Sequence, residues 1–139
     1  MFSGELVVVY ERAPGICKAL TLIVSNLEEF SNIRLEKVYC VRSYKARTRA
    51  IARIYGLPRP WIVAGLEPGY VIEVVSERFY SLPCRERVGV LIHELLHIPR
   101  GFTGGLRKHG ELVNSRVERR LLSKLDKKII LEACKAVEQ

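Results

Sequence analysis

The histidines of this chain are confined to one short segment, and that confinement constrains the fold more than any other feature. The segment begins with His93-Glu94-Leu95-Leu96-His97 and runs through a glycine-rich stretch to His109. Residues four apart lie on the same face of a helix, so His93 and His97 can bind one metal ion if the segment is helical. The chain must then turn back after His97 so that His109 reaches the same point.

The residues around this motif predict the required helix independently. An apolar stripe with helical spacing precedes and overlaps it, formed by Val88, Leu91, Ile92, Leu95 and Leu96. Pro83 suits the first helical turn, and Pro99-Arg100-Gly101 ends the helix directly after the motif. We therefore expect a helix over residues 83–98 and a loop over residues 99–110.

Three imidazoles and one carboxylate in this arrangement are typical of a catalytic metal site. We interpret His93, His97 and His109 as ligands of one Zn2+ ion per chain, with the fourth position open to water. Glu94 is one helical step from the first ligand, where it can act on that water as general base. We expect the glycine-rich loop to become ordered together with the metal.

Other residues are candidates for supporting roles. Arg107 and Tyr70 are candidate donors to a developing oxyanion, although a loop-anchoring or solvent-exposed Arg107 is an equally ordinary interpretation. Asn114 is a candidate for orienting a metal ligand, against the alternative of a helix-surface asparagine. Gly101, Gly104 and Gly105 suit a loop that reverses the chain.

The length of 139 residues favours one domain over residues 1–139. No apolar run reaches the length of a membrane span, and Met1–Glu5 lacks the features of a signal peptide, so we expect a cytoplasmic protein without membrane association. Cys-x-x-Cys pairs are absent, so zinc must be held by the histidines. We expect buried free thiols, with disulfides as the alternative in a hyperthermophile, at Cys17, Cys40, Cys84 and Cys134.

The formal net charge of +8 favours acidic partners, with nucleic acid as the obvious class. Basic residues are concentrated in two places. One group comprises Arg42, Lys45, Arg47, Arg49 and Arg53, and the other comprises Arg116, Arg119, Arg120, Lys124, Lys127 and Lys128. The ordinary interpretation of both groups is the solvated face of a basic protein, so nucleic-acid binding through these groups is permitted without being required.

The remaining pattern predicts an α+β fold, a mixed sheet packed by helices. Expected strands cover residues 5–10, 36–42, 45–55, 61–64 and 70–75, and the 45–55 strand has one solvated face. Expected helices cover residues 15–32 and 111–137 in addition to the motif helix. The last of these is a long C-terminal helix with a buried stripe at four-residue spacing.

Several segments resemble a metallopeptidase family of phages and archaea. They are His93–Pro99, Phe102–Arg107, His109-Gly110, Tyr70–Val74 and Arg49–Pro58. The resemblance implies a zincin-like domain in which an edge strand holds an extended peptide above the metal. SprT-like and Spartan proteases are similar more distantly, although this chain lacks their Cys-rich ribbon. Metzincins differ, because Thr103 stands where their third histidine would be, and nothing near Cys84 resembles the peptide deformylase motif.

Alternatives to this interpretation remain open. Some zincins use a glutamate from the following helix, so Glu111 and Glu118 are rival third ligands to His109. We prefer His109, because imidazole is a good zinc ligand and no other histidine is available. In one alternative function, the zinc stabilises a nucleic-acid-binding domain. In another, three histidines serve a nuclease that cleaves phosphodiesters. A protein or peptide substrate is the expected partner, and the oligomeric state is not predicted.

Overall fold

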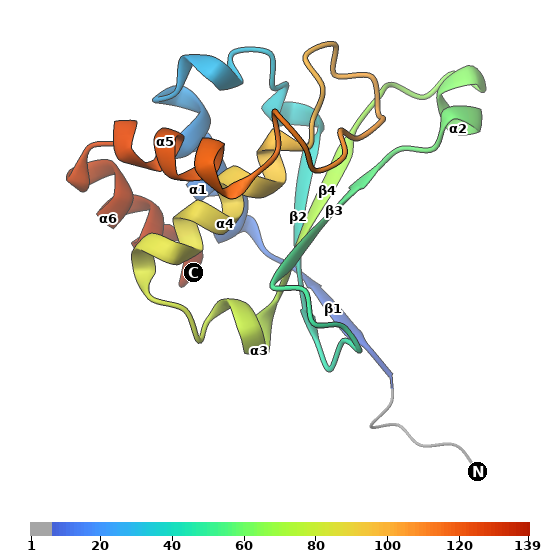
Figure 1. Cartoon of the computed structure of the whole chain (residues 1–139). Coiled ribbons are helices and arrows are strands. Elements are labelled where there is room, and N and C mark those ends of the chain that lie inside the picture. Colours follow the sequence, from blue (N-terminus) through green and yellow to red (C-terminus); the bar gives the residue numbers. More distant parts are fainter. Residues whose placement is uncertain (1–6) are drawn as a thin grey trace.

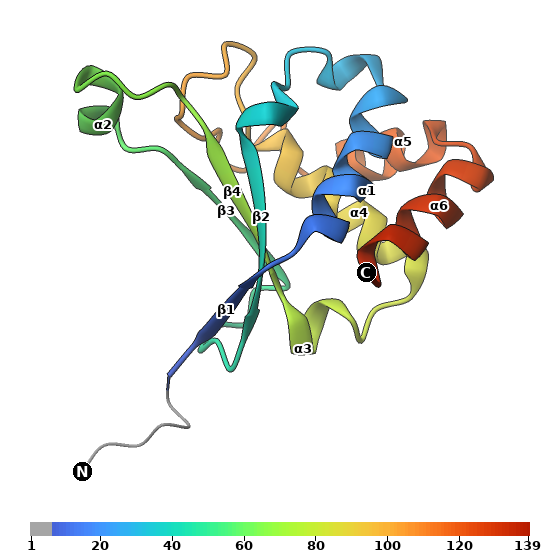
Figure 2. The same cartoon turned by 180° about the vertical axis from the view of Figure 1, so that it is seen from behind.

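The computed structural model describes residues 7–139 and has an α+β architecture (Figure 1). A four-stranded mixed sheet carries the larger helices on one side, and the turned view shows the same separation into two layers (Figure 2). The strand order is β1-β2-β4-β3. The predicted fold class is therefore confirmed.

The sheet is built around one parallel pair. Strand β2 (Val38–Tyr44) runs parallel to β4 (Tyr70–Val75), while β1 (Val9–Arg12) pairs with β2 and β3 (Ala52–Gly56) pairs with β4, both antiparallel. Strand β4 has the bounds that its β-branched and aromatic residues predict. Strand β3 is an edge strand, because only one of its sides is paired.

Four helices form the second layer, two of them packed on the sheet and the other two packed on those helices. These are α1 (Pro14–Ser25), α4 (Cys84–Leu96), α5 (Ser115–Lys124) and α6 (Lys127–Val137). Short helices α2 (Arg59–Val63) and α3 (Ser76–Phe79) and the 3-10 turns η2 (Glu28–Phe30) and η3 (Leu35–Lys37) complete the elements. The α4 stripe is fully buried at Val88, Leu91, Ile92 and Leu95, so burial fixes the rotation of the helix that carries the histidine motif.

Some expected elements differ from the observed ones. The segment 61–64 is not a strand but belongs mostly to α2, because Pro60 in its first turn favours helical backbone angles and the Pro60 carbonyl accepts a hydrogen bond from Ala64. The expected 45–55 strand is a loop until β3 begins at Ala52. The first helix ends at Ser25 rather than at residue 32, and β1 begins at Val9, although Glu5 and Leu6 of that prediction lie outside the described residues.

The expected C-terminal helix over residues 111–137 is divided into two helices. Asn114 caps α5 by accepting a hydrogen bond from the Val117 amide. Leu125 has an extended backbone, and the Asp126 carboxylate accepts a hydrogen bond from the Lys128 amide to start α6. The buried stripe continues across this break, because Leu121, Leu125 and Ala133 are all buried.

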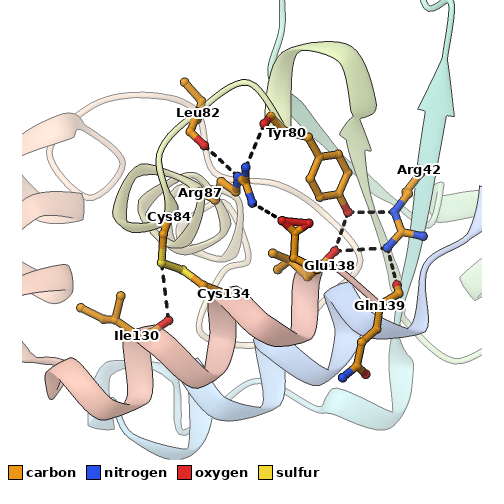
Figure 3. Close-up of polar contacts among 10 residues, drawn as sticks. Arg42, Tyr80, Leu82, Cys84, Arg87, Ile130, Cys134, Glu138 and Gln139 are labelled. Atoms are coloured by element: carbon orange, nitrogen blue, oxygen red, sulfur yellow. Dashed lines mark hydrogen bonds and ion pairs between the residues drawn. A yellow bond between two sulfur atoms is a disulfide. The ribbon is translucent and has the colours of Figure 1, made fainter.

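The expectation of free thiols is wrong, because the cysteines form two disulfides. Cys17–Cys40 joins α1 to β2, and Cys84–Cys134 joins the first residue of α4 to α6 (Figure 3). Cysteines that are distant in the sequence carry no sign of their pairing, and only the packing of α1 on β2 and of α6 on α4 brings them together.

A polar network beside the second disulfide holds the end of α6 (Figure 3). Arg87 on α4 donates to the carbonyls of Tyr80 and Leu82, at 2.8 Å each, and forms an ion pair with Glu138 at 3.0 Å. The Tyr80 hydroxyl donates to the Val137 carbonyl at 2.7 Å and accepts from Arg42 at 2.8 Å. The first half of α4 is therefore fixed to the segment that precedes it and to the end of α6.

Within residues 7–139, no helix is long and apolar enough to cross a membrane.

Candidate metal centre

Three histidines from two elements converge at the C-terminal end of α4. His93 lies in the last turn of the helix, His97 is the residue directly after it, and His109 lies on the loop that leads to α5. One ring nitrogen of each histidine lies within 4.8 Å of the other two, and the ring centroids are 4.8 to 5.1 Å apart. The helical spacing thus places the first pair, and the loop supplies the third ring.

The loop is joined to the end of α4 by a reciprocal pair of hydrogen bonds. The Arg107 amide donates to the His97 carbonyl at 2.7 Å, and Nδ1 of His97 lies 2.7 Å from the Arg107 carbonyl oxygen. Because a carbonyl can only accept, Nδ1 of His97 carries the proton and Nε2 has a free lone pair. The Arg107 backbone therefore fixes both the ring orientation and the tautomer of His97.

His93 has a different partner. Its Nδ1 lies 3.2 Å from Oε1 of Glu118 on α5, so this carboxylate holds the ring and leaves Nε2 facing His109. Helix α5 can approach because residue 89, one turn before His93, is a glycine: a Cβ there would lie 3.2 Å from Oε2 of Glu118. Gly89 and His93 share a helix face, and Glu118 spans both.

One pair of ring nitrogens has nearly the separation expected around a tetrahedral metal ion. Nε2 of His93 and Nε2 of His109 are 3.1 Å apart. Two ligand atoms at the usual zinc–nitrogen distance of about 2.0–2.1 Å from a tetrahedral ion would be about 3.3 Å apart. Two of the three rings also use Nδ1 for a carboxylate or a carbonyl, the usual outer contact of a metal-bound histidine.

The Glu94 carboxylate is buried next to this group, with 7% of its surface exposed. Among the described residues, no side chain or backbone group donates a hydrogen bond to it. Burial raises the pKa of Glu94 to about 7, with the Glu118 charge adding to the rise and the His93 charge opposing it. A carboxyl group with this pKa can exchange a proton near neutrality, as a general base or acid must.

The environments of the histidines also differ. Hydrogen bonding to Glu118 raises the pKa of His93 above its ordinary value, and burial opposes that rise. Burial lowers the pKa of His97, the hydrogen bond with the Arg107 carbonyl opposes this change, and the charges of His93 and His109 lower the pKa further. His97 is therefore held in the neutral form that binds metals.

The site opens into a cavity of about 460 Å³ next to the edge strand. Besides the residues already described, Val90 and the segment 50–52 line it. Ile51 accepts a hydrogen bond from Val75 at 2.9 Å, and Leu57 donates to Gly69 at 3.1 Å. Because hydrogen-bonded pairs alternate in an antiparallel ladder, the amides and carbonyls of Ala52 and Ile54 point away from β4, toward the free edge.

The other residues singled out in the sequence lie outside the cavity. Tyr70 is buried, and its hydroxyl donates to the Gly105 carbonyl and accepts from the Gly104 amide, at 2.8 Å each, so it anchors the loop. The Arg107 guanidinium donates to the Leu96 carbonyl at 3.4 Å and lines a different cavity. These contacts disagree with an oxyanion-binding role for either residue and match the loop-anchoring interpretation of Arg107.

Asn114 and the two rival glutamates have distinct positions. The Asn114 amide group donates to the Gly110 carbonyl at 2.7 Å and to the Glu111 carbonyl at 3.1 Å, so it fixes the chain directly after His109. The Glu111 side chain is exposed and is not among the converging groups. Glu118 contacts Nδ1 of His93, the ring nitrogen that does not face the other two histidines. From its position in the sequence Glu118 was expected only as a rival ligand, although the frequent pairing of metal-bound histidines with carboxylates is a signal for this positioning role.

Part of the first basic group is occupied by internal contacts. Arg42 belongs to the network around Tyr80, and Arg53 donates two hydrogen bonds to Glu73, at 3.0 and 3.2 Å. Glu73 lies on β4, is fully buried and also accepts from Ser43 and Tyr55. These two arginines therefore stabilise the fold, and the structure gives no support for a nucleic-acid surface that includes them.

The sequence model of the family described as "Putative phage metallopeptidase" matches residues 8–133. That range includes the whole sheet, helices α1 to α5 and the three converging histidines. Neither a curated protein nor a solved structure gives a significant match.

Proposed function

The chain belongs to the putative phage metallopeptidase family, and on this premise we propose that it is a zinc-dependent peptidase whose general base is Glu94. The proposal rests on one observation above all: three histidine nitrogens converge next to the buried carboxylate of Glu94. Nε2 atoms of His93 and His97, together with His109, would hold the ion. The proposed substrate is a protein or peptide.

The bound zinc would polarise the scissile carbonyl and lower the pKa of a water molecule from 15.7 toward about 7. Glu94 would take the proton of the attacking water and then deliver it to the leaving amine. Glu118 and the Arg107 carbonyl would act as positioning groups that keep the rings of His93 and His97 in place.

The unpaired edge of β3 is a place where an extended peptide substrate could bind. Peptide chains bind exposed strand edges through backbone hydrogen bonds, and the outward groups of Ala52 and Ile54 offer two such positions next to the cavity. We propose that the substrate adds to β3 as an antiparallel strand. Its scissile bond would then lie near the segment 50–52.

The test compares metal content and peptide cleavage in matched variants. Glu94→Gln preserves size and removes the base, so zinc should stay near one per chain while the rate of cleavage falls about 100-fold or more. Glu86→Gln is the control, because Glu86 is an exposed carboxylate on the same helix. Equal cleavage by the Glu94→Gln protein and the wild type would refute the proposed base. Cleavage of RNA that survives this substitution would indicate the nuclease alternative.

A further inference from the structure

A second groove lies at the far end of β3, between α2 and the loop that carries His109. Its volume is about 480 Å³, and its apolar lining includes Leu57, Ile62, Val63 and Leu106. Thr103, Gly104 and Gly105 form the wall contributed by the loop. The groove has no part in holding the metal or in the proton transfers described above.

Two apolar side chains of the lining are left in contact with solvent, Val63 at 76% and Leu106 at 43% exposed, and α2 also exposes Trp61 at 55%. Isolated apolar residues are ordinary on a protein surface, but several around one groove indicate a binding surface. The lining also contains Arg59 and, among the described residues, no acidic group. The groove therefore suits an apolar side chain of a ligand whose neighbouring groups are neutral or acidic.

The groove and the metal centre are connected by two elements. The loop lines the groove with residues 103–106 and then reaches His109 three positions later. Strand β3 lines the metal cavity with Ala52 and the groove with Gly56. In both views this loop lies between α4 and α2 (Figures 1 and 2). A peptide chain extended along β3 would pass from one site to the other.

We propose that this groove binds an apolar side chain of the peptide substrate, on the N-terminal side of the scissile bond. The inference rests on the proposed peptidase function and on an antiparallel substrate, whose N-terminal part must lie toward Gly56. Ala52 and Leu57 are separated by about 17 Å of strand at about 3.4 Å per residue. The side chain in the groove therefore belongs about four to six residues before the cleaved bond.

The first measurement maps cleavage in ten-residue peptides that carry one Leu, or one Asp at the same position, in an Ala/Gly/Ser background. Leu at one position about four to six residues before the cleaved bond should raise kcat/KM about 10- to 100-fold over Asp, the usual scale for burying such a side chain. The change should appear in KM rather than in kcat, because the groove contacts the ground state and the transition state alike.

Variants of the groove provide the second measurement. Val63→Asp and Leu106→Asp replace exposed apolar side chains of the groove and should remove the preference for Leu. Leu131→Asp is the matched control, because Leu131 is 58% exposed on α6, outside the groove. If the groove variants retain the Leu preference of the control, the inference is refuted.

A binding measurement separates this inference from the proposed function. Trp61 is the single tryptophan of the chain and lies next to Ile62 and Val63, so its fluorescence can report peptide binding by the Glu94→Gln protein. If zinc-loaded wild-type protein cleaves no peptide, the proposed function fails, and tighter binding of Leu than of Asp peptides still supports the groove. Equal affinity for the Leu and Asp peptides would refute the inference about the groove. Concentration-dependent self-association that Val63→Asp abolishes would also refute this inference, because the groove would then bind a second copy of the chain.

Discussion

Replacing Glu118 with alanine separates two roles that this residue could have. If Glu118 only holds His93, its loss leaves three ligands and frees one ring to rotate. Removing such an outer partner typically weakens metal binding about 10- to 100-fold, equivalent to about 1.4 to 2.7 kcal/mol. If Glu118 were itself a ligand, its loss would cost as much as losing a histidine.

His109→Ala provides the scale for the loss of a ligand. Structural zinc sites with four ligands bind with about 10–16 kcal/mol at neutral pH, so one ligand accounts for roughly 2.5–4 kcal/mol. Zinc affinity should therefore fall by about 70- to 900-fold in His109→Ala. Competition with a chromogenic chelator of known affinity would measure both variants. Glu111→Ala is the control, since the Glu111 side chain is exposed and outside the converging group.

The pH dependence of zinc binding gives a second, independent signature of the contact. Glu118 raises the pKa of His93, so protons compete with zinc at a higher pH than they would at an unpaired histidine. As the pH is lowered, the affinity of the wild type should begin to fall earlier than that of Glu118→Ala. The reasoning is refuted if Glu118→Ala empties the site while His109→Ala leaves it filled, or if Glu118→Ala changes neither affinity nor pH dependence.

Three further predictions concern a buried ion pair, the two disulfides and the loop that carries His109. Glu73→Gln should lower the free energy of unfolding by about 2 kcal/mol near pH 7, because Arg53 loses a buried partner but keeps some contact with solvent. Burial opposes ionisation of Glu73, yet its hydrogen bonds lower the pKa, so the difference should shrink in denaturant titrations as the pH falls below about 4. Breaking the Cys84–Cys134 disulfide, which spans 50 residues, should cost about 4 kcal/mol and lower the Tm more than breaking Cys17–Cys40, which spans 23. Hydrogen exchange with chelator should lose protection near residues 108–112 and keep it at 103–107; loss over the whole loop would contradict the anchoring by Tyr70.

The sequence predicted the elements whose residues carry a strong local pattern. Strand β4 and helix α4 were predicted with nearly correct bounds because β-branched runs and a continuous apolar stripe each favour one structure. The prediction of a strand over segment 45–51 was wrong, because alternating basic and small residues are as compatible with a loop as with a strand. The break at Leu125 was missed because the buried stripe has the same spacing on both sides of it.

Some features of the candidate metal centre could likewise be predicted from local sequence, and others depend on the assembled fold. The helical spacing of His93 and His97 follows from local geometry, and so does the position of Glu94 beside them. The contact of His93 with Glu118 depends on how α5 crosses α4, which only the assembled fold determines. Gly89 was the available sign, because a glycine within a helix costs about 1 kcal/mol relative to alanine and often marks a close approach.

The loop between α4 and α5 is anchored by hydrogen bonds on both sides of His109. From the sequence we expected zinc to order this loop. In the structure Tyr70 holds the loop at Gly104 and Gly105, and Arg107 forms its pair of hydrogen bonds with His97. Asn114 fixes the chain on the other side of His109. We therefore expect metal binding to order mainly the few residues between these anchors, with little loss of backbone entropy. The same anchors hold the wall of the groove, and a substitution that loosens Tyr70 should therefore weaken zinc binding and substrate selection together.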